Sequence, residues 1–420
     1  MPSVEGVPAR RAALQMLDSV LRRGRTLDSA SQAAKDLKPS DLALAIAIAG
    51  EVLRRMPDLD GLIDSATRQR LPGDSKARMV LRIALAQKIG LGTPEHALVA
   101  TALPLVDGGP RRLVHGVLGT LLRKGVAPID APRLPDDVEQ RWAAAWGEEV
   151  LAAARRSIVK RPPLDLSFTT DEEAKAFASS EGGASLAEKH ARLNAAGSVS
   201  GLAGFAQGRW WVQDLAASLP ARLIPPGAEH VLDLCAAPGG KTMQMAAAGH
   251  HVTAVDQSET RLKRLRENLE RTGLKADLVP ADAAQWQPRR TFDAILLDAP
   301  CSATGTFRRH PEVLYRARRQ VIQDSAGIQA QLLAQAAAWL EPGGALVYSV
   351  CSLEPEEGEA IVQRFLQENR AFEIAAPKAG ELPGFVTSSP EGWVRILPGL
   401  LESDGGLDGF FVARLVRRAG

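Results

Sequence analysis

The chain of 420 residues is longer than the roughly 250–300 residues at which a single hydrophobic core stops growing, so it should contain two or three domains. Its 45% hydrophobic and 24% charged residues are typical of a globular protein, and its net charge of +2 excludes a general electrostatic attraction to nucleic acid. Three cysteines are too few for a disulfide framework, and the lack of a signal-peptide pattern or of an apolar run of ~18–20 residues predicts a cytoplasmic protein with no membrane-spanning segment.

Residues 1–127 are predicted to form an all-α domain. The leucines between residues 14 and 21 recur at the spacing of one helix face, and Gly24 should end this helix. A second helix is expected from Pro39 to Pro57, because proline suits the first turn of a helix but interrupts its interior. Further helices are expected over residues 76–89, after the N-cap Thr93 with Pro94 at the first helical position, and over residues 114–121. Amphipathic helices joined by short loops indicate a helical bundle.

Residues 128–207 are expected to form a linker helix, at about residues 150–158, and a small α+β subdomain. From residue 208 to 420, short apolar segments alternate with helices, which predicts a parallel, doubly wound, Rossmann-like α/β domain. The expected strands are residues 231–234, 252–255, 278–279, 294–297 and 346–350, followed by an antiparallel pair at one sheet edge, residues 394–397 and 410–415.

A glycine-containing loop follows the first expected strand: residues 233–242 read Asp-Leu-Cys-Ala-Ala-Pro-Gly-Gly-Lys-Thr. Ligands of open α/β sheets bind at this end of the strands, and Gly239 and Gly240 would let a cofactor approach the backbone. The Gly-Lys-Thr ending resembles a phosphate-binding loop, but that motif requires glycine where Cys235 stands. The loop also lacks the G-x-G-x-x-G of dinucleotide-binding proteins.

Acidic residues follow the next two expected strands. Asp256 can accept hydrogen bonds from both hydroxyls of a ribose, and Asp282 is placed to meet an adenine edge. Each residue alone would more often be a turn or cap residue. Together with the glycine loop, they favour a cofactor that contains adenosine.

Two cysteines follow adjacent expected strands. Cys301 lies in Asp298-Ala299-Pro300-Cys301 after the fourth strand, and Cys351 follows the fifth. Neighbouring strands are about 4.8 Å apart, so both thiols should lie on one rim beside the glycine loop. A single free cysteine is often a buried, inert residue, but two at adjacent strand ends are hard to explain by packing. They are too few for a structural zinc site, and no metal is expected.

Two thiols on one rim suit a specific chemistry. Addition of a thiolate to carbon 6 of cytosine makes carbon 5 nucleophilic enough to take a methyl group, and a second thiol can assist release of the product. Asp298 could hold nitrogen 3 of the base in its protonated form, and Lys241 adds positive charge. An enzyme that methylates an exocyclic amine would instead need an aromatic residue where Cys301 stands.

These motifs resemble those of the RNA 5-methylcytosine methyltransferases of the Nop/Sun family. The segments that carry the resemblance are residues 233–242, 298–305, 350–352, Gln213-Asp214, Arg309-His310-Pro311 and residues 408–411. The N-terminal helices resemble a NusB-type RNA-binding domain, in segments such as Gly116-Val117-Leu118. Residues 164–168 read Leu-Asp-Leu-Ser-Phe, without the arginine and asparagine usual in the family, so the resemblance carries no RNA contact to this segment.

The resemblance implies a monomeric enzyme that methylates RNA, namely 16S ribosomal RNA of the small subunit, with S-adenosyl-L-methionine as cofactor. Its catalytic residues would be Cys351 as nucleophile, Cys301 for product release, Asp298 and Lys241. Its cofactor-binding residues would be Cys235, Ala236, Ala237, Pro238, Gly239, Gly240, Lys241, Asp256, Arg261, Asp282 and Asp298.

A basic cluster, Arg308, Arg309 and His310, follows the Cys301 loop and suits contacts with RNA phosphates. The alternative to an enzyme is a catalytically idle RNA-binding or ribosome assembly factor that uses the sheet as a scaffold. The presence of Cys351 and Cys301 together argues against this alternative.

Overall fold

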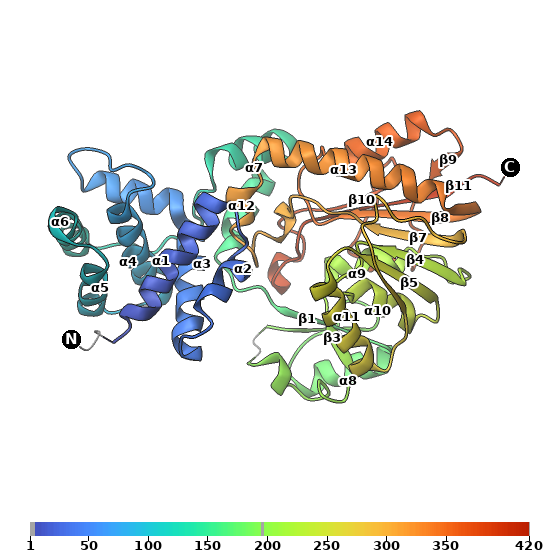
Figure 1. The fold of residues 1–420 in the computed structure, drawn as a ribbon, viewed down its shortest axis with the longest axis horizontal. Helices are drawn as coiled ribbons and strands as arrows, with labels where there is room; N and C mark the ends of the chain where they lie inside the picture. Colours follow the sequence, from blue (N-terminus) through green and yellow to red (C-terminus); the bar gives the residue numbers. More distant parts are fainter. Residues whose placement is uncertain (1–4, 195–196, 420) are drawn as a thin grey trace. The chain divides into compact units, whose positions relative to one another are not determined.

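The computed structural model describes residues 5–194 and 197–419, which form two compact units (Figure 1). The first unit comprises Met1–Lys160 and Phe307–Ala317, and the second comprises Arg161–Thr306 and Arg318–Gly420. The expected segment 128–207 is thus divided between the two units. Within the described residues, no helix is both long and apolar enough to cross a membrane.

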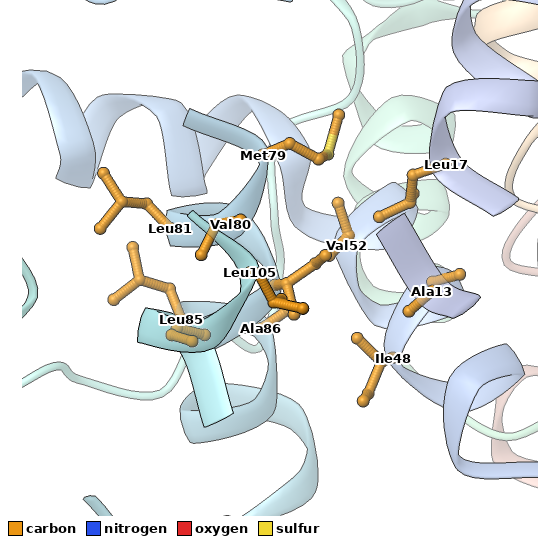
Figure 2. Close-up of a cluster of buried hydrophobic side chains, with 14 of the residues drawn as sticks. Ala13, Leu17, Ile48, Val52, Met79, Val80, Leu81, Leu85, Ala86 and Leu105 are labelled. Atoms are coloured by element: carbon orange, nitrogen blue, oxygen red, sulfur yellow. The ribbon is translucent and has the colours of Figure 1, made fainter. Parts of the chain in front are cut away.

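The first unit is all-α, as the sequence predicts. Its helices are α1 (Val7–Arg23), α2 (Leu27–Ser31), α3 (Pro39–Ser65), α4 (Lys76–Leu91), α5 (Glu95–Ala102), α6 (Gly108–Lys124), α7 (Asp136–Ile158) and α12 (Val313–Arg316). Figure 2 shows part of its core, to which α1 contributes Leu17, α3 contributes Val52 and α4 contributes Met79. Every residue of α4 from Ala77 to Gln87 is buried, so this helix is central to the unit.

The prediction that Pro57 ends the second helix is wrong, because α3 continues to Ser65 with Pro57 inside it. Proline has no N–H group to bond the carbonyl four residues before it, which here is that of Leu53. The hydroxyl of Tyr315 donates a hydrogen bond to this carbonyl at 2.7 Å. Leu59, beyond the proline, is fully buried, and burial of the continued helix offsets the proline's cost.

Replacing Tyr315 by phenylalanine should therefore destabilise the first unit by about 1–3 kcal/mol, because the Leu53 carbonyl would be left buried without a donor. Urea unfolding followed by circular dichroism measures the change. The matched control is Pro57→Ala, which restores an N–H group to the helix. In that background Tyr315→Phe should cost less, and equal costs in both backgrounds would contradict the explanation.

Two other helices differ from the prediction. The linker helix begins at Asp136 rather than near residue 150, and it contains Gly147 with a φ of 84°, where two helical segments meet. Trp142 in its first segment packs edge-on against Phe307, with ring centroids 5.4 Å apart. The helix expected to begin at Pro94 begins at Glu95, since Pro94 is extended and forms the N-cap.

The second unit contains the predicted doubly wound sheet. Its strands are β4 (His230–Leu234), β5 (His251–Asp256), β6 (Asp277–Pro280), β7 (Phe292–Asp298), β8 (Leu340–Val350), β9 (Phe372–Ile374), β10 (Val394–Ile396) and β11 (Phe410–Arg417). The order is β10-β11-β8-β7-β4-β5-β6, with β9 on β11. Strands β4 to β8 pair in parallel, and the predicted antiparallel pair β10–β11 lies at one edge. Since β4 lies between β5 and β7, the order reverses there, at the usual ligand-binding point of such sheets.

Helices cover both faces of this sheet (Figure 1). α13 (Arg319–Ala338) and α14 (Glu359–Glu368) pack on one face, where Leu333 and Val362 join the core of β7 and β8. α9 (Leu215–Arg222), α10 (Gly240–Ala247) and α11 (Glu259–Thr272) pack on the other. The parallel strands β4, β5 and β7 are therefore mostly buried on both faces, as their continuous apolar sequence predicts, whereas the edge strand β6 is partly exposed.

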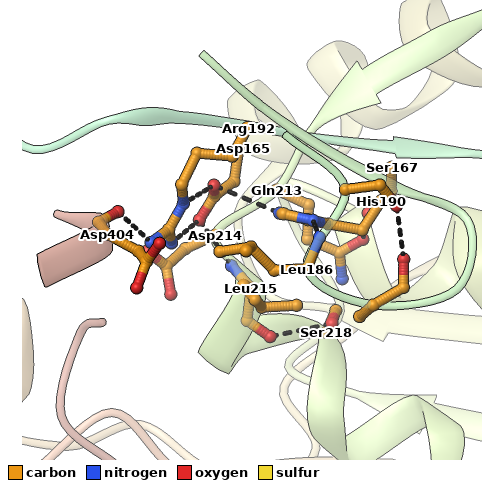
Figure 3. A network of polar contacts seen from close by, with 12 residues as sticks. Asp165, Ser167, Leu186, His190, Arg192, Gln213, Asp214, Leu215, Ser218 and Asp404 are labelled. Carbon is orange, nitrogen blue, oxygen red and sulfur yellow. Dashed lines mark hydrogen bonds and ion pairs between the residues drawn. The ribbon is translucent and has the colours of Figure 1, made fainter. Parts of the chain in front are cut away.

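A small three-stranded sheet precedes β4 in the second unit. It has the order β2-β1-β3, with β1 at Leu164–Phe168, β2 at His190–Leu193 and β3 at Trp210–Val212, and α8 (Asp171–Ser180) packs on it. Asp165 on β1 forms two hydrogen bonds with Arg192 on β2, at 2.6 and 2.7 Å (Figure 3). Asp165 also accepts a hydrogen bond from the N–H of Leu215 at the start of α9. This segment, which departs from the family pattern, is thus occupied by buried internal contacts.

Candidate active site

The loop after β4 brings the backbone close to α11. Gly239 has a φ of 100°, and a Cβ atom there would lie 2.0 Å from the side chain of Leu265 on α11. Only glycine fits this combination of left-handed backbone and close approach. The next residue, Gly240, begins α10, beside the side chain of Gln213. Gln213 in turn donates a hydrogen bond to Gln244 on α10 at 2.9 Å, which fixes the helix that starts at the loop.

Asp256, at the end of β5, is 3% exposed and faces this loop. Its carboxylate accepts hydrogen bonds from the N–H groups of Ala237, at 3.0 Å, and Ser258, at 2.9 Å. Arg261 lies 3.5 Å from the same carboxylate and donates to the carbonyl of Ala237. Asp256 therefore fixes the conformation of the loop.

A buried carboxyl group that the sequence argument missed lies under the loop. Asp233 on β4 is fully buried, and its Oδ2 accepts a hydrogen bond from Thr242 at 2.6 Å. Within residues 5–194 and 197–419, its Oδ1 has no hydrogen-bond partner. Burial raises the pKa of Asp233 to about 7. Asp233 begins the motif that singled out the loop, so its place on the strand could have been inferred, but its unpaired oxygen could not.

Lys241 and Asp298 form an ion pair at the ends of α10 and β7. Lys241 Nζ donates to Asp298 Oδ2 at 2.8 Å, and Ser349 on β8 donates to Oδ1 at 3.0 Å. Burial lowers the pKa of Lys241, but the charge and hydrogen bond of Asp298, together with the charges of Cys351 and Asp233, outweigh it, and the net shift is upward. Lys241 Nζ also lies 5.2 Å from the ring centroid of Phe410. The lysine is therefore held as a cation in contact with Asp298.

The two cysteines lie side by side, as the adjacent strands β7 and β8 predict. Their sulfur atoms are 3.6 Å apart, and both residues are partly exposed. The hydrogen bond to Cys351, burial and the negative charges of Cys351 and Glu357 raise the pKa of Cys301 well above its usual value. Cys301 therefore tends to keep its proton. The third cysteine, Cys235, has a pKa raised to about 12 by burial and by nearby carboxylates, so it is unsuited to act as a thiolate.

The remaining sequence-predicted residues are not gathered in one place. Asp282 is exposed and caps its own turn, accepting hydrogen bonds from the N–H of Ala284 and from Gln285. Arg308, Arg309 and His310 belong to the first unit, in the segment Phe307–Ala317. Arg308 is 3% exposed, whereas Arg309 and His310 are partly exposed. The latter two are therefore the accessible members of the cluster.

The described residues contain no group of three or more histidine, cysteine or acidic side chains that could hold a metal ion. The loop, by contrast, fits an adenosine cofactor, because glycines clear its backbone and a buried carboxylate ends the next strand. A parallel sheet of this strand order, with such a loop where the order reverses, is the arrangement expected of an S-adenosyl-L-methionine-dependent methyltransferase.

Comparison with known proteins gives the family. The family model described as "16S rRNA methyltransferase RsmB/F" matches residues 220–416, and that of the NusB family matches residues 7–123. The chain belongs to the RsmB/F methyltransferase family and carries a NusB domain at its N-terminal end.

The relatives match nearly the whole chain. "Ribosomal RNA small subunit methyltransferase B" of Erwinia tasmaniensis is 33% identical over 97% of this chain and 98% of that protein. The protein of the same name from Klebsiella pneumoniae strain 342 is 31% identical with the same coverage.

Among solved structures, PH0851 superimposes with a TM-score of 0.73 at 23% identity, over 98% of this chain and 99% of that one. A methyltransferase homolog from Pyrococcus horikoshii has a TM-score of 0.56 at 28% identity, over 71% of this chain and 98% of its own. The first of these likenesses supports the fold alone.

Asp256→Ala should weaken binding of S-adenosyl-L-methionine, since it removes the carboxylate at the end of β5. One lost charge-assisted hydrogen bond is worth roughly 1.5–3 kcal/mol, or about 10- to 150-fold in affinity. Isothermal titration calorimetry measures the effect, with Glu368→Ala, at an exposed ion pair outside the loop, as the comparison. Unchanged affinity in a folded Asp256 variant would sink the assignment, and binding of ATP in place of the methyl donor would revive the phosphate-loop interpretation.

Proposed function

We propose that this protein transfers the methyl group of S-adenosyl-L-methionine to carbon 5 of a cytosine in 16S ribosomal RNA, through a covalent bond between Cys351 and carbon 6 of the base. The observation that carries the proposal is the pair of sulfur atoms 3.6 Å apart, at the ends of β7 and β8. A pair of thiols suits a reaction in which one forms a bond to the substrate and the other assists its breakage.

The Cys351 thiolate forms a bond to carbon 6, and the electron pair of the C5–C6 double bond takes the methyl group supplied by the cofactor. Carbon 5 then loses its proton to water, the electron pair of that C–H bond re-forms the double bond, and the Cys351 sulfur leaves as a thiolate. We assign Cys301 to this release, because it lies within contact of the departing sulfur.

Asp298 and Lys241 support the attack on carbon 6. A cytosine protonated at nitrogen 3 is more electrophilic, and an ionised Asp298 can accept a hydrogen bond from that nitrogen. Lys241 holds one oxygen of this carboxyl group at 2.8 Å. Ser349 holds the other oxygen of the carboxylate and so limits its rotation.

The names of the relatives support small-subunit ribosomal RNA as the substrate, since they are ribosomal RNA small subunit methyltransferases. We assign RNA binding to the NusB domain and to Arg309 and His310. A target base must leave any stacked helix to reach a thiol, so an unpaired or flipped cytosine is the expected substrate.

The test uses 16S RNA labelled with tritium at carbon 5 of its cytosines, as naked RNA and in the small-subunit particle. Methylation at carbon 5 must release this tritium, one atom for each methyl group transferred. Methyl transfer without tritium release would place the reaction at another atom. Neither transfer nor release with either substrate would favour the catalytically idle assembly factor.

A further inference from the structure

A buried carboxylate lies behind the two cysteine loops. Glu357 precedes α14 and is fully buried. Its Oε1 accepts hydrogen bonds from the N–H of Ser302, at 2.8 Å, and from Gln329, at 3.2 Å. Its Oε2 accepts from the hydroxyls of Ser302 and Ser352. Four donors thus surround one carboxylate, which offsets much of the cost of burying its charge.

The donors come from the residues that follow the two cysteines. Ser302 follows Cys301 and Ser352 follows Cys351, so the Glu357 carboxylate joins the two loops directly. The hydroxyl of Tyr348 on β8 also donates to the main-chain carbonyl of Glu357 at 2.6 Å. Hydrogen bonds therefore fix both the side chain and the backbone of Glu357. Because Glu357 joins the two cysteine loops, it also fixes the distance between them.

The charge of Glu357 also acts on Cys301. It is among the causes that raise the pKa of the Cys301 thiol, after the hydrogen bond to Cys351 and burial. Burial in turn raises the pKa of Glu357 itself, against the effect of its hydrogen bonds.

The other charged groups near these loops are paired. Lys241 contacts Asp298, and Arg395, which donates to the carbonyl of Ser352, contacts Glu359. Burial raises the pKa of Tyr348 well above its usual value, so its hydroxyl stays neutral.

We propose that Glu357 is a positioning residue for the two thiols: its hydrogen bonds to Ser302 and Ser352 set the separation of Cys301 and Cys351 and keep their roles distinct while Cys351 attacks. The inference rests on the proposed function for its place in the reaction. Two equivalent thiolates would compete for carbon 6 and repel each other. One thiol held in the protonated form separates their roles.

The first test requires no RNA. Alkylation of each cysteine by iodoacetamide is measured against pH in the full chain, by mass spectrometry of the cysteine-containing peptides. Glu357→Gln keeps the size of the side chain and removes the charge, so the pH midpoint for Cys301 should fall, by about one unit. Glu381→Gln is the control: its carboxylate is also partly buried and paired, with Arg414, away from the cysteines.

The second test measures turnover. In Glu357→Gln, kcat should fall by about tenfold or more, because small displacements of reacting groups are costly, while the KM for RNA stays unchanged. Glu381→Gln should change neither. If the Glu357 carboxylate acts by keeping Cys301 protonated, the fall in kcat should be smaller at lower pH, where Cys301 is protonated without it.

The outcomes separate this inference from the proposed function. A folded Glu357→Gln protein with an unchanged Cys301 midpoint and unchanged kcat overturns the role of Glu357, even if the wild type releases tritium from carbon 5. If the pH midpoint of Cys301 shifts in Glu357→Gln but the wild type does not methylate carbon 5, the effect of Glu357 on Cys301 stands and the proposed function is rejected.

If Glu357→Gln does not fold, Ser302→Ala carries the test, because it keeps the charge and removes one anchor of the Cys301 loop. This variant should lower kcat without lowering the Cys301 midpoint. Unchanged kcat in Ser302→Ala would then overturn the inference.

Discussion

Methylation should become undetectable in Cys351→Ala, whereas Cys301→Ala should remain attached to RNA through denaturing electrophoresis. Without the Cys351 sulfur no bond to carbon 6 can form, so carbon 5 stays a poor nucleophile. Without Cys301 the attack and the methyl transfer can still occur, but the step that expels Cys351 loses its assisting group. The measurement is a gel shift of protein on radiolabelled RNA, together with methyl transfer from labelled cofactor.

The double variant is the control for this prediction, and it should form no adduct because the attacking thiol is gone. An adduct in Cys351→Ala and none in Cys301→Ala would reverse the two roles. If both single variants are inactive and neither forms an adduct, the assignment of Cys301 to product release is withdrawn, while the family membership stands.

The proximity of the two cysteines could be predicted from the sequence because it depends on a simple property of parallel sheets. The segments that end at Asp298 and Val350 read as consecutive apolar strands, and consecutive strands in a doubly wound sheet are often neighbours. The carboxyl ends of these strands then lie at the same edge of the sheet, regardless of the conformation of the loops that follow. For the same reason, the sequence predicted that the glycine loop after β4 and Asp256 at the end of β5 lie at this edge.

Glu357 could not be found in this way. It lies in a turn between β8 and α14, and its sequence context, Glu356-Glu357-Gly358, reads as a solvated acidic loop. Its burial depends on donors from Ser302 and Gln329, which are distant in sequence. Pairing between positions far apart leaves no periodic signal, so only the structure reveals it.

The prediction that the helix ends at Pro57 is wrong because it, too, depends on a contact between residues far apart in the sequence. A local rule about proline is correct on average, but here Tyr315 supplies the hydrogen bond that proline cannot make. Tyr315 belongs to the segment Phe307–Ala317, which packs in the first unit although it follows the Cys301 loop in sequence. The composition of the segment gave no sign of this, because its arginines suggested a surface for RNA.

Asp165→Ala should destabilise the second unit by about 3–5 kcal/mol, the usual cost of removing one partner from a buried ion pair. Arg192 is 2% exposed, and both of its hydrogen bonds to Asp165 would be lost (Figure 3). The Nη1 atom of Arg192 would still donate hydrogen bonds to the carbonyls of Asp404 and Gly406, but these neutral acceptors do not balance its charge. The N–H of Leu215, at the start of α9, would also lose its acceptor.

Urea unfolding of the full chain measures this loss, with hydrogen exchange of peptides from residues 164–193 to identify the transition of the second unit. The matched control is Glu368→Ala, which removes an exposed ion pair with Arg364 and should change stability by no more than about 0.5 kcal/mol. Equal effects of the two substitutions would show that the Asp165–Arg192 pair does not hold the small sheet.

The pH dependence of this contribution has a definite sign. Burial raises the pKa of Asp165, but the hydrogen bonds and charge of Arg192 and the contact with His190 at 3.1 Å outweigh it, and the net shift is downward. A carboxyl group with a depressed folded-state pKa binds fewer protons than in the unfolded chain, so it stabilises the fold at every pH above about 4. The stabilisation is lost as the pH falls below that value toward the folded-state pKa. The difference in unfolding free energy between wild type and Asp165→Ala should therefore be constant near neutral pH and shrink in acid, and a difference that grows on acidification would contradict the ion-pair explanation.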